Sequence, residues 1–408
     1  MNSTLRFAFL AIIVAAPAAA QVSPVSPAAP ATPQTPVAPP QRPQVNSPVV
    51  DGEKTTFAIY APKASEVTLG SAEIDRLIPG RNKPFTKAEN GVWSLTVSPL
   101  PPGIYEYSIN VDGVSMADPS SPNVVGNVRG ARGTVEVPGP AGKPRHDEWR
   151  PVAHGTLTQH WYDSKVTQTR RRIHVYTPAG YGTSTKKYPV LYLLHGAGDN
   201  DAHWSQLGRA NVIADNLLAD GKIVPMLIVM TDGHPYRPQQ GEPGGREKAL
   251  KMFEDDLLLE VQPLVEKTYR VDTTRARRAL AGLSMGGGQT LNVGLGHPDR
   301  YAYLGAFSAA TGGADAHVQA LARNAAAFNK DSRLFWIRIG KDDFLLQQNR
   351  TLVDALKKAG IEHVYEETDG AHMWGFWRQA LADFLPKLFK PAGPAPAAAA
   401  PPSAQAAR

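Results

Sequence analysis

The segment Gly282-Leu283-Ser284-Met285-Gly286 constrains this chain more than any other, because it follows an apolar run and leads into further small residues. A Gly-x-Ser-x-Gly sequence in that setting predicts a very tight strand-to-helix turn, in which only glycine or a very small residue fits two positions either side of the serine. Such a turn holds the Ser284 hydroxyl out above a sheet. The same five-residue pattern arises by chance in glycine-rich loops, so its meaning depends on partners elsewhere in the chain.

Two candidate partners follow Ser284 along the chain, first an acid and then a histidine. A serine hydroxyl needs a histidine to take its proton and a carboxylate to fix the tautomer of that histidine. Residues 334–340 predict a buried strand, and Asp342 and Asp343 lie in the loop that follows it. His372 lies in a later glycine loop, so the order serine, acid, histidine matches that of hydrolases built on such a turn. The sequence therefore predicts a triad of Ser284, His372 and one of the two aspartates.

Several of the 11 histidines compete with His372 for the role of base, namely His195, His203, His234, His297 and His363. His363 falls inside a predicted strand, and His297 belongs to a His-Pro pair that ends a predicted helix. His195 directly follows an apolar strand, and we interpret it as a residue that shapes its loop. His372 is preferred because it lies in a glycine loop after a strand and completes the set.

A fourth element lies upstream, where residues 188–194 run apolar into His195-Gly196-Ala197-Gly198. This pattern predicts a strand followed by a loop that stabilises an oxyanion. A tetrahedral intermediate carries negative charge on the former carbonyl oxygen, and losing one fixed N–H donor to that oxygen typically costs ~3 to 4 kcal/mol. We expect the N–H groups of Ala197 and Met285 to be the two donors.

The charge balance and the absence of cysteine exclude several other classes of protein. The chain has 43 Lys and Arg against 37 Asp and Glu, and the resulting net charge of +6 is modest for 408 residues. Residues 170–172 are all arginine, but an alternating pattern follows them, so we interpret them as the solvated start of a strand and expect no nucleic-acid partner. Without cysteine, disulfides and thiolate metal sites cannot form. The predicted chemistry needs no cofactor and no metal.

Both ends of the chain predict segments outside the folded domains. Residues 1–20 carry Arg6, an apolar run and Ala18-Ala19-Ala20, which predicts a signal peptide and a secreted or periplasmic protein. The apolar run is too short for a stable membrane anchor, and the lack of cysteine excludes a lipoprotein anchor. Residues 21–48 predict a linker rich in proline and alanine, and residues 392–408 predict a disordered tail.

The remainder of the chain predicts two domains. Residues 49–140 contain short alternating runs punctuated by turns, which is typical of a small immunoglobulin-like β-sandwich. A stretch rich in proline and glycine, 138–144, leads into residues 145–391, where predicted strands and helices alternate. Alternation of this kind argues for a mostly parallel sheet covered by helices on both faces.

Three aromatic residues lie in predicted strands of the sandwich: Trp93, Tyr105 and Tyr107. Neighbouring side chains of a strand point to opposite faces, so Tyr105 and Tyr107 share one face. That face is either core or an exposed aromatic platform. Burial is the default for such residues.

Residues 145–391 resemble the esterase D type of α/β-hydrolase, especially the feruloyl and acetylxylan esterases of carbohydrate esterase family 1. The segments that carry the resemblance are 195–199, 208–217, 282–287, 340–343 and 370–374. The resemblance implies an α/β-hydrolase fold for this domain and a serine esterase activity.

The same resemblance bears on individual residues of the site. In that family the acid follows a Gly-x-x-Asp pattern, which implies Asp343 rather than Asp342. The oxyanion donor of the upstream loop is the residue after a His-Gly pair, which implies Ala197. Trp204 and Trp374 occupy positions that in such enzymes tend to lie beside the acyl pocket, with core packing as the alternative.

The amino-terminal sandwich resembles the family 48 carbohydrate-binding modules found beside glycan-active enzymes. The resemblance is carried by 57–64, 91–93, 103–109 and Asp118-Pro119. Because such modules often serve only as structural partners, the resemblance implies either glycan binding or a structural role.

These features predict a secreted serine carboxylesterase that removes feruloyl or acetyl groups from plant cell-wall xylan through an acyl-enzyme. Its substrate would be a polysaccharide-linked or small ester. A siderophore esterase of the enterochelin type and a sugar acyltransferase are alternatives, since both use the same kind of triad. A glycan-binding scaffold with a degenerate hydrolase domain is the alternative without activity, and the intact triad speaks against it. The acyl group and the oligomeric state stay open.

Overall fold

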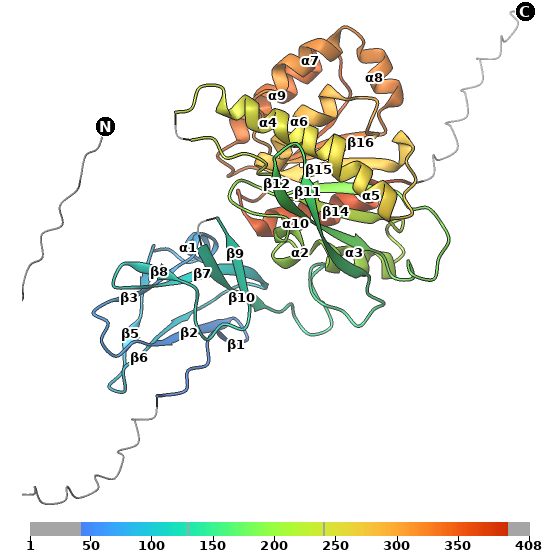
Figure 1. The fold of residues 1–408 in the computed structure, drawn as a ribbon. Helices are drawn as coiled ribbons and strands as arrows, with labels where there is room; N and C mark the ends of the chain where they lie inside the picture. The colour runs from blue at the N-terminus through green and yellow to red at the C-terminus, as the bar shows by residue number, and fades with distance from the viewer. Residues whose placement is uncertain (1–41, 129, 240, 391–408) are drawn as a thin grey trace, which may run out of the picture. The chain divides into compact units, whose positions relative to one another are not determined.

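The computed structural model describes residues 42–128, 130–239 and 241–390. The predicted signal peptide, residues 21–41 of the predicted linker and the predicted tail lie outside the described residues. The described residues from Pro43 to 390 belong to one compact unit, which contains a β-sandwich followed by an α/β domain (Figure 1). In the described part of the chain, no helix has the length and apolar character needed to cross a membrane.

The sandwich consists of two antiparallel sheets (Figure 1). One sheet has the order β1-β2-β6-β5, and the other has the order β4-β3-β7-β10-β9, with β8 paired to β7. The strands are β1 (Val49–Asp51), β2 (Lys54–Tyr60), β3 (Val67–Gly70), β4 (Lys83–Pro84), β5 (Thr86–Lys87), β6 (Val92–Val97), β7 (Gly103–Val111), β8 (Val114–Met116), β9 (Val124–Asn127) and β10 (Gly130–Val137). A short helix without a counterpart in the sequence prediction, α1 (Ala72–Leu77), lies between β3 and β4.

Aromatic side chains fill the core of the sandwich. Trp93, Tyr105 and Tyr107 are all buried, so they belong to the core and do not form an exposed platform. Tyr107 donates a hydrogen bond from its hydroxyl to Asp118. Ser47, which falls in the predicted linker, is also buried and donates a hydrogen bond to Asp118. The sandwich therefore begins slightly before residue 49, because this polar contact ties the preceding segment to it.

The α/β domain is centred on one eight-stranded sheet with the order β11-β12-β14-β13-β15-β16-β17-β18. The strands are β11 (Thr156–Ser164), β12 (Thr169–Thr177), β13 (Val190–Leu194), β14 (Leu227–Thr231), β15 (Arg278–Leu283), β16 (Tyr303–Phe307), β17 (Leu334–Gly340) and β18 (Val364–Thr368). The strands from β13 to β18 pair in parallel, whereas β11 and β12 are antiparallel at one edge. The prediction of a mostly parallel sheet is confirmed.

Helices cover both faces of this sheet (Figure 1). They are α2 (His203–Gln206), α3 (Ala210–Ala219), α4 (Gly245–Asp256), α5 (Gln262–Thr268), α6 (Met285–Gly296), α7 (Ala314–Ala322), α8 (Ala325–Asp331), α9 (Leu346–Lys358) and α10 (Trp374–Phe384), with η1 (Leu257–Val261), η2 (Arg275–Arg277) and η3 (Leu385–Lys387) as shorter turns. In β13, Leu191 and Leu193 pack on the side of α2, α3 and α10. Val190 and Tyr192 pack on the side of α4 to α9, as the alternation of strand side chains requires.

The start of β7 contributes to the core of the α/β domain. Ile104 is buried there with side chains of α3 and α10. Arg378 of α10 is also buried, and it donates hydrogen bonds to the carbonyls of Ile104 and Leu207. Its Nε lies 2.7 Å from Asp147 Oδ2. Because a buried charge without partners is costly, the sandwich and the segment that follows it help to stabilise the α/β domain.

Candidate active site

Ser284 occupies a tight turn between β15 and α6. The strand ends at Leu283 and the helix begins at Met285, so Ser284 alone forms the connection. Its φ of 52° and ψ of −114° lie in a region that costs energy for a residue with a side chain. A Cβ on Gly286 would lie 2.5 Å from the carbonyl oxygen of His195, so that position requires glycine. The turn predicted from the Gly-x-Ser-x-Gly pattern is confirmed.

The structure brings Ser284, His372 and Asp343 together. Ser284 Oγ lies 2.9 Å from His372 Nε2, and His372 Nδ1 lies 2.9 and 3.0 Å from the two carboxylate oxygens of Asp343. All three residues follow the carboxyl ends of parallel strands: β15, β18 and β17. Since a carboxylate only accepts, Nδ1–H must be the donor to Asp343, which leaves Nε2 free to accept the proton of Ser284.

The two adjacent aspartates have different surroundings. Asp343 is 5% exposed and also accepts a hydrogen bond from the backbone N–H of Leu345. Burial alone would raise the pKa of Asp343, but the hydrogen bonds from His372 and Leu345 outweigh it and hold that pKa below its usual value. Asp342 is exposed and forms an ion pair with Arg76 of the sandwich. Of the two candidates, the structure places Asp343 against the histidine.

The loop after β13 lies against the Ser284 turn. A Cβ on Gly196 would lie 3.6 Å from the Cβ of Ser284, and Ala197, the next residue, is exposed. Met285 is the first residue of α6, and the first N–H groups of a helix have no acceptor within it. Both predicted donors are therefore on segments next to Ser284, and their binding of an oxyanion stays a prediction.

Two histidines hold this loop in place. His195 is buried; its Nε2 accepts a hydrogen bond from the Gly233 N–H at 2.8 Å, and its Nδ1 lies 2.8 Å from the carbonyl oxygen of Gly196. His234 Nε2 accepts from the Gly198 N–H at 3.2 Å. Burial lowers the pKa of His234 to about 4, so its imidazole is neutral and can accept. These contacts agree with the interpretation that His195 shapes its loop.

The interpretation of residues 170–172 as the solvated start of a strand is correct for the strand but wrong for Arg171. Its side chain is 7% exposed, and its Nε lies 3.2 Å from Asp256 Oδ2. It also donates hydrogen bonds to the carbonyls of Asp232 and His234, in the loop after β14. Burial raises the pKa of Asp256 to about 6 despite the charge of Arg171. Arg171 thus stabilises the loop that in turn holds Gly198.

Trp204 and Trp374 are 1% and 5% exposed and pack edge to face, with ring centroids 5.2 Å apart. Trp204 Nε1 donates a hydrogen bond to the carbonyl of Leu194 at 2.9 Å. The structure therefore places both in the hydrophobic core, which was the stated alternative. That either residue lines an acyl pocket stays a prediction, and their burial favours the packing role.

Two aromatic residues that no motif singled out flank His372. Phe344 directly follows the acid in the chain, is 76% exposed, and has its ring 4.4 Å from the His372 ring. Trp377 of α10 is buried, meets the His372 ring edge-on at 4.8 Å, and donates from Nε1 to the Ser308 hydroxyl. Only the fold brings these residues to the site, so a search for sequence motifs misses them.

Within residues 42–128, 130–239 and 241–390, no group of three or more His, Asp and Glu side chains is arranged to hold a metal ion. The groups gathered around Ser284 are those of acid–base and nucleophilic chemistry.

Comparison with known families agrees with this geometry. Residues 164–388, more than half of the chain, match the Esterase family. The chain belongs to the Esterase family. Residues 44–122 match carbohydrate-binding module 48, also described as the isoamylase N-terminal domain. The two resemblances noted in the sequence are therefore both confirmed.

Relatives with curated descriptions include glycan-active enzymes. The chain is 31% identical over 357 residues to the "endo-1,4-beta-xylanase/feruloyl esterase" of Xylanibacter ruminicola, covering 86% of this chain and 47% of that protein. It thus spans about half the length of that relative. It is 25% identical to the "acetyl esterase" of Caldicellulosiruptor saccharolyticus, covering 48% of this chain and 80% of that protein.

Solved structures share the fold. A CE1 ferulic acid esterase from Anaeromyces mucronatus, in complex with ferulic acid, matches with a TM-score of 0.52 and 26% identity, covering 59% of this chain and 93% of that one. The enterobactin esterase of Shigella flexneri matches with a TM-score of 0.57, covering 82% of this chain and 92% of that one. At 17% identity, the second match shows a shared fold alone. The α/β-hydrolase fold with a preceding sandwich is confirmed.

Proposed function

We propose that this protein is a secreted serine carboxylesterase that removes feruloyl or acetyl groups from plant cell-wall xylan. The observation that carries the proposal is the continuous hydrogen-bonded path from Asp343 through His372 to Ser284, on a turn that leaves the serine half-buried. A nucleophile, a base and an orienting carboxylate in contact are what acyl transfer to serine requires. Membership in the Esterase family supports the same chemistry.

The first half of the reaction forms an acyl-enzyme. Ser284 Oγ attacks the ester carbonyl carbon while His372 Nε2 takes its proton, and Asp343 stabilises the imidazolium. The N–H groups of Ala197 and Met285 bind the oxyanion of the tetrahedral intermediate. His372 then gives the proton to the departing sugar oxygen, and the bond between that oxygen and the acyl carbon breaks.

The second half returns the free enzyme. A water molecule attacks the acyl carbon while His372 Nε2 takes a proton from it, and the oxyanion again forms at the same two N–H groups. His372 then protonates Ser284 Oγ as the carboxylic acid departs. In each half His372 takes up one proton and gives it up again. At the end of the second half, His372 and Ser284 are both unchanged.

The substrate class has two supports. Relatives and solved neighbours carry the names feruloyl esterase, ferulic acid esterase and acetyl esterase. In addition, the exposed ring of Phe344 beside His372 offers an apolar face to an aromatic acyl group. An aromatic pair is worth ~0.5 to 1.5 kcal/mol beyond burial of its area. An acetyl group would gain nothing comparable, so Phe344 favours the feruloyl substrate.

Export and the role of the sandwich complete the proposal. Residues 1–20 have the pattern of a cleavable signal peptide, which would bring the enzyme to extracellular xylan. The match to carbohydrate-binding module 48 is compatible with a glycan-facing sandwich. The burial of Trp93, Tyr105 and Tyr107 means that any glycan contact would use other residues.

The test is product analysis after incubation with arabinoxylan that carries both feruloyl and acetyl groups. The proposal predicts release of ferulate or acetate by the purified protein and none by Ser284→Ala. Parallel reactions with a catecholate siderophore ester and with an acyl donor plus a sugar alcohol cover the two enzymatic alternatives. Turnover of only the siderophore ester, or acyl transfer without hydrolysis, would contradict the proposed substrate, and no turnover at all would favour the scaffold.

A further inference from the structure

Helix α1 of the sandwich contacts two loops that carry triad residues. The helix is anchored in the sandwich by Ile74, which is fully buried, and it begins after Ser71, whose hydroxyl accepts a hydrogen bond from the Ile74 N–H. Glu73 and Arg76 are three positions apart and so lie on one side of the helix. Both of them contact the α/β domain.

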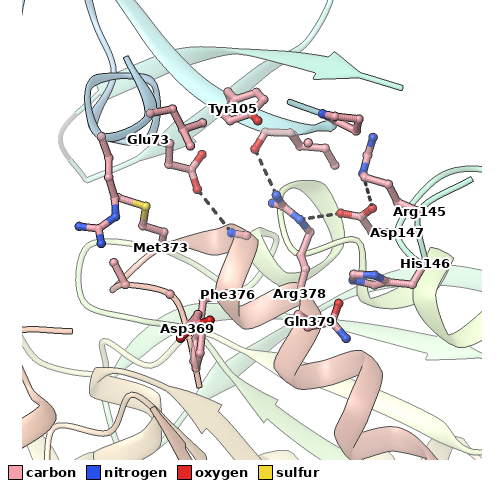
Figure 2. A pocket seen from close by; sticks show the side chains of 18 of the residues that line it. Glu73, Tyr105, Arg145, His146, Asp147, Asp369, Met373, Phe376, Arg378 and Gln379 are labelled. Carbon is pink, nitrogen blue, oxygen red and sulfur yellow. Dashed lines mark hydrogen bonds and ion pairs between the residues drawn. The ribbon is translucent and has the colours of Figure 1, made fainter. Parts of the chain in front are cut away.

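Glu73 caps the helix that follows the catalytic histidine. Its Oε1 accepts a hydrogen bond from the backbone N–H of Gly375, with the oxygen and nitrogen 3.4 Å apart (Figure 2). Gly375 is the second residue of α10, whose preceding residue Met373 provides no side-chain cap and whose first turn has no acidic residue. The first N–H groups of a helix attract acceptor and acidic groups. Glu73 supplies from the sandwich the acceptor that α10 lacks in its own sequence.

Helix α10 in turn contacts His372 directly and Asp343 through Ser308. Its first residue follows His372 by two positions, and Trp377 meets the His372 ring edge-on at 4.8 Å. Trp377 Nε1 also donates to the Ser308 hydroxyl at 3.1 Å, and that hydroxyl forms a hydrogen bond with Asp343. A displacement of α10 would therefore move the side chains that hold the imidazole and the carboxylate.

Arg76 makes a second contact, to the loop of the acid. It pairs with Asp342, and the backbone N–H of Asp342 donates to the carbonyl of Gly370 in the histidine loop. The Arg76 and Asp342 side chains are 43% and 59% exposed. Since exposed ion pairs contribute little, we assign the larger effect to Glu73.

A pocket of about 570 Å³ lies beside the Glu73 contact (Figure 2). Its lining includes Glu73, Gly370, Met373 and Gly375, but neither Ser284 nor His372. Open space thus borders one side of this end of α10, whereas Trp374 and Trp377 pack on its other side. On the side of the pocket, Glu73 supplies the contact with the end of the helix.

We propose that Glu73 is a positioning residue for His372: by accepting a hydrogen bond from the N-terminal end of α10, it holds the imidazole where it can take the proton of Ser284. The inference rests on the triad role proposed above. It makes the sandwich part of the catalytic apparatus even for a small ester that has no glycan to bind. Either protonation state of the Glu73 carboxyl keeps an acceptor oxygen, so the contact does not require its charge.

The variants Glu73→Met and Glu73→Gln isolate the acceptor oxygen. Methionine fills a similar volume and favours a helix but offers no oxygen, whereas glutamine keeps the acceptor. A misplacement of a catalytic group by ~1 Å costs about 100-fold in rate. The bond from Gly375 to Glu73 is long, at 3.4 Å, so its loss should displace His372 by less than that. We therefore expect Glu73→Met to lower kcat by about 10-fold. For 4-nitrophenyl acetate, KM should stay within about twofold in both variants, since ground-state binding is untouched. Glu73→Gln should keep kcat within about twofold, because its amide oxygen can still accept the hydrogen bond.

Asp75→Ala is the matched control on the same helix. Asp75 pairs with Lys83 Nζ at 2.7 Å inside the sandwich and has no contact with α10 in the described structure. Its loss leaves Lys83, which is buried, without its carboxylate partner. We therefore expect Asp75→Ala to lower Tm while leaving the kcat of the folded protein unchanged.

The experiment measures kcat, KM and Tm of the full chain and these three variants on 4-nitrophenyl acetate. Loss of kcat in Glu73→Met with retention in Glu73→Gln and Asp75→Ala supports the inference. Equal loss in Glu73→Met and Asp75→Ala, or kcat of Glu73→Met within about twofold of the unmodified protein, would overturn it, since a positioning effect must exceed that. Failure of the unmodified protein to hydrolyse any ester would instead overturn the proposed function.

Discussion

Replacing Asp343 with asparagine tests which of two adjacent aspartates orients His372, the proposed base. The Asp343 carboxylate accepts from His372 Nδ1–H at 2.9 Å and from the Leu345 N–H at 2.9 Å. Asparagine keeps the shape, but one carboxylate oxygen becomes an NH₂ group that donates. The variant therefore favours the imidazole tautomer with its hydrogen on Nε2, which cannot take a proton from Ser284.

The size of the effect follows from the surroundings of the carboxylate. In a well-studied triad, this tautomer error lowers kcat by ~10⁴, or about 5.4 kcal/mol of transition-state stabilisation. Asp343 is 5% exposed, so water cannot replace the lost acceptor, and we expect a loss of that order here. Asp342 is 59% exposed and its side chain pairs with the exposed Arg76, so Asp342→Asn should change kcat by less than about threefold.

The assay is the steady-state hydrolysis of 4-nitrophenyl acetate near neutral pH by both variants, with Tm measured beside it. Similar Tm values and a far larger loss for Asp343→Asn than for Asp342→Asn are the expected outcome. The reverse ranking would make Asp342 the acid. Small losses in both variants would refute the reasoning that a carboxylate fixes the tautomer of His372.

Three further predictions follow from contacts around the site. Phe344→Ala should lower kcat/KM for methyl ferulate by about fivefold while changing that for 4-nitrophenyl acetate little, since only the aromatic acyl group stacks on the ring; equal losses on both would reject the contact. Deleting residues 49–137 removes Ile104 from the core, one acceptor from Arg378 and the Glu73 contact with α10, so both Tm and kcat on a small ester should fall, and an unchanged Tm would reject the structural role. On insoluble xylan, a proportionally larger loss would indicate glycan binding, whereas equal losses would exclude targeting. Burial alone would raise the pKa of Asp232, but the charge of Arg171 and the hydrogen bond from the His234 N–H lower it to about 2. In the unfolded chain this carboxyl titrates at ~3.9, so between the folded and unfolded pKa values the unfolded state binds more protons, and the free energy of unfolding rises with pH. Asp232→Asn should flatten that rise. An unaltered pH dependence would contradict the lowered pKa of Asp232.

The parts of the fold that depend on local pattern could be predicted from the sequence. The Gly-x-Ser-x-Gly turn is such a part, because Gly286 has no room for a Cβ and few sequences satisfy that requirement. The buried strand predicted at 334–340 also appears there, as β17. The order of Ser284, acid and His372 along the chain identified the triad, but local pattern left Asp342 and Asp343 open, and only the family resemblance separated them.

What could not be predicted depends on contacts between distant segments. Arg171 looked solvated, because nothing near it in the chain reveals that it meets Asp256 and the loop after β14. The contact of Glu73 with Gly375 joins residues 302 positions apart. Helix α1 is only six residues long and gives no periodic signal. Phe344 reads as an ordinary loop residue until the fold brings His372 beside it.

The most direct test of the account is the turnover of Ser284→Ala, measured on 4-nitrophenyl acetate and on methyl ferulate beside the unmodified protein. In the proposed mechanism Ser284 is the nucleophile that forms the acyl-enzyme, and removing a triad nucleophile leaves only oxyanion and binding effects. We expect kcat to fall by about 10⁴-fold or more with Tm nearly unchanged. Retention of more than about a tenth of the activity by the folded variant would contradict the account, because the chemistry would then proceed without the serine.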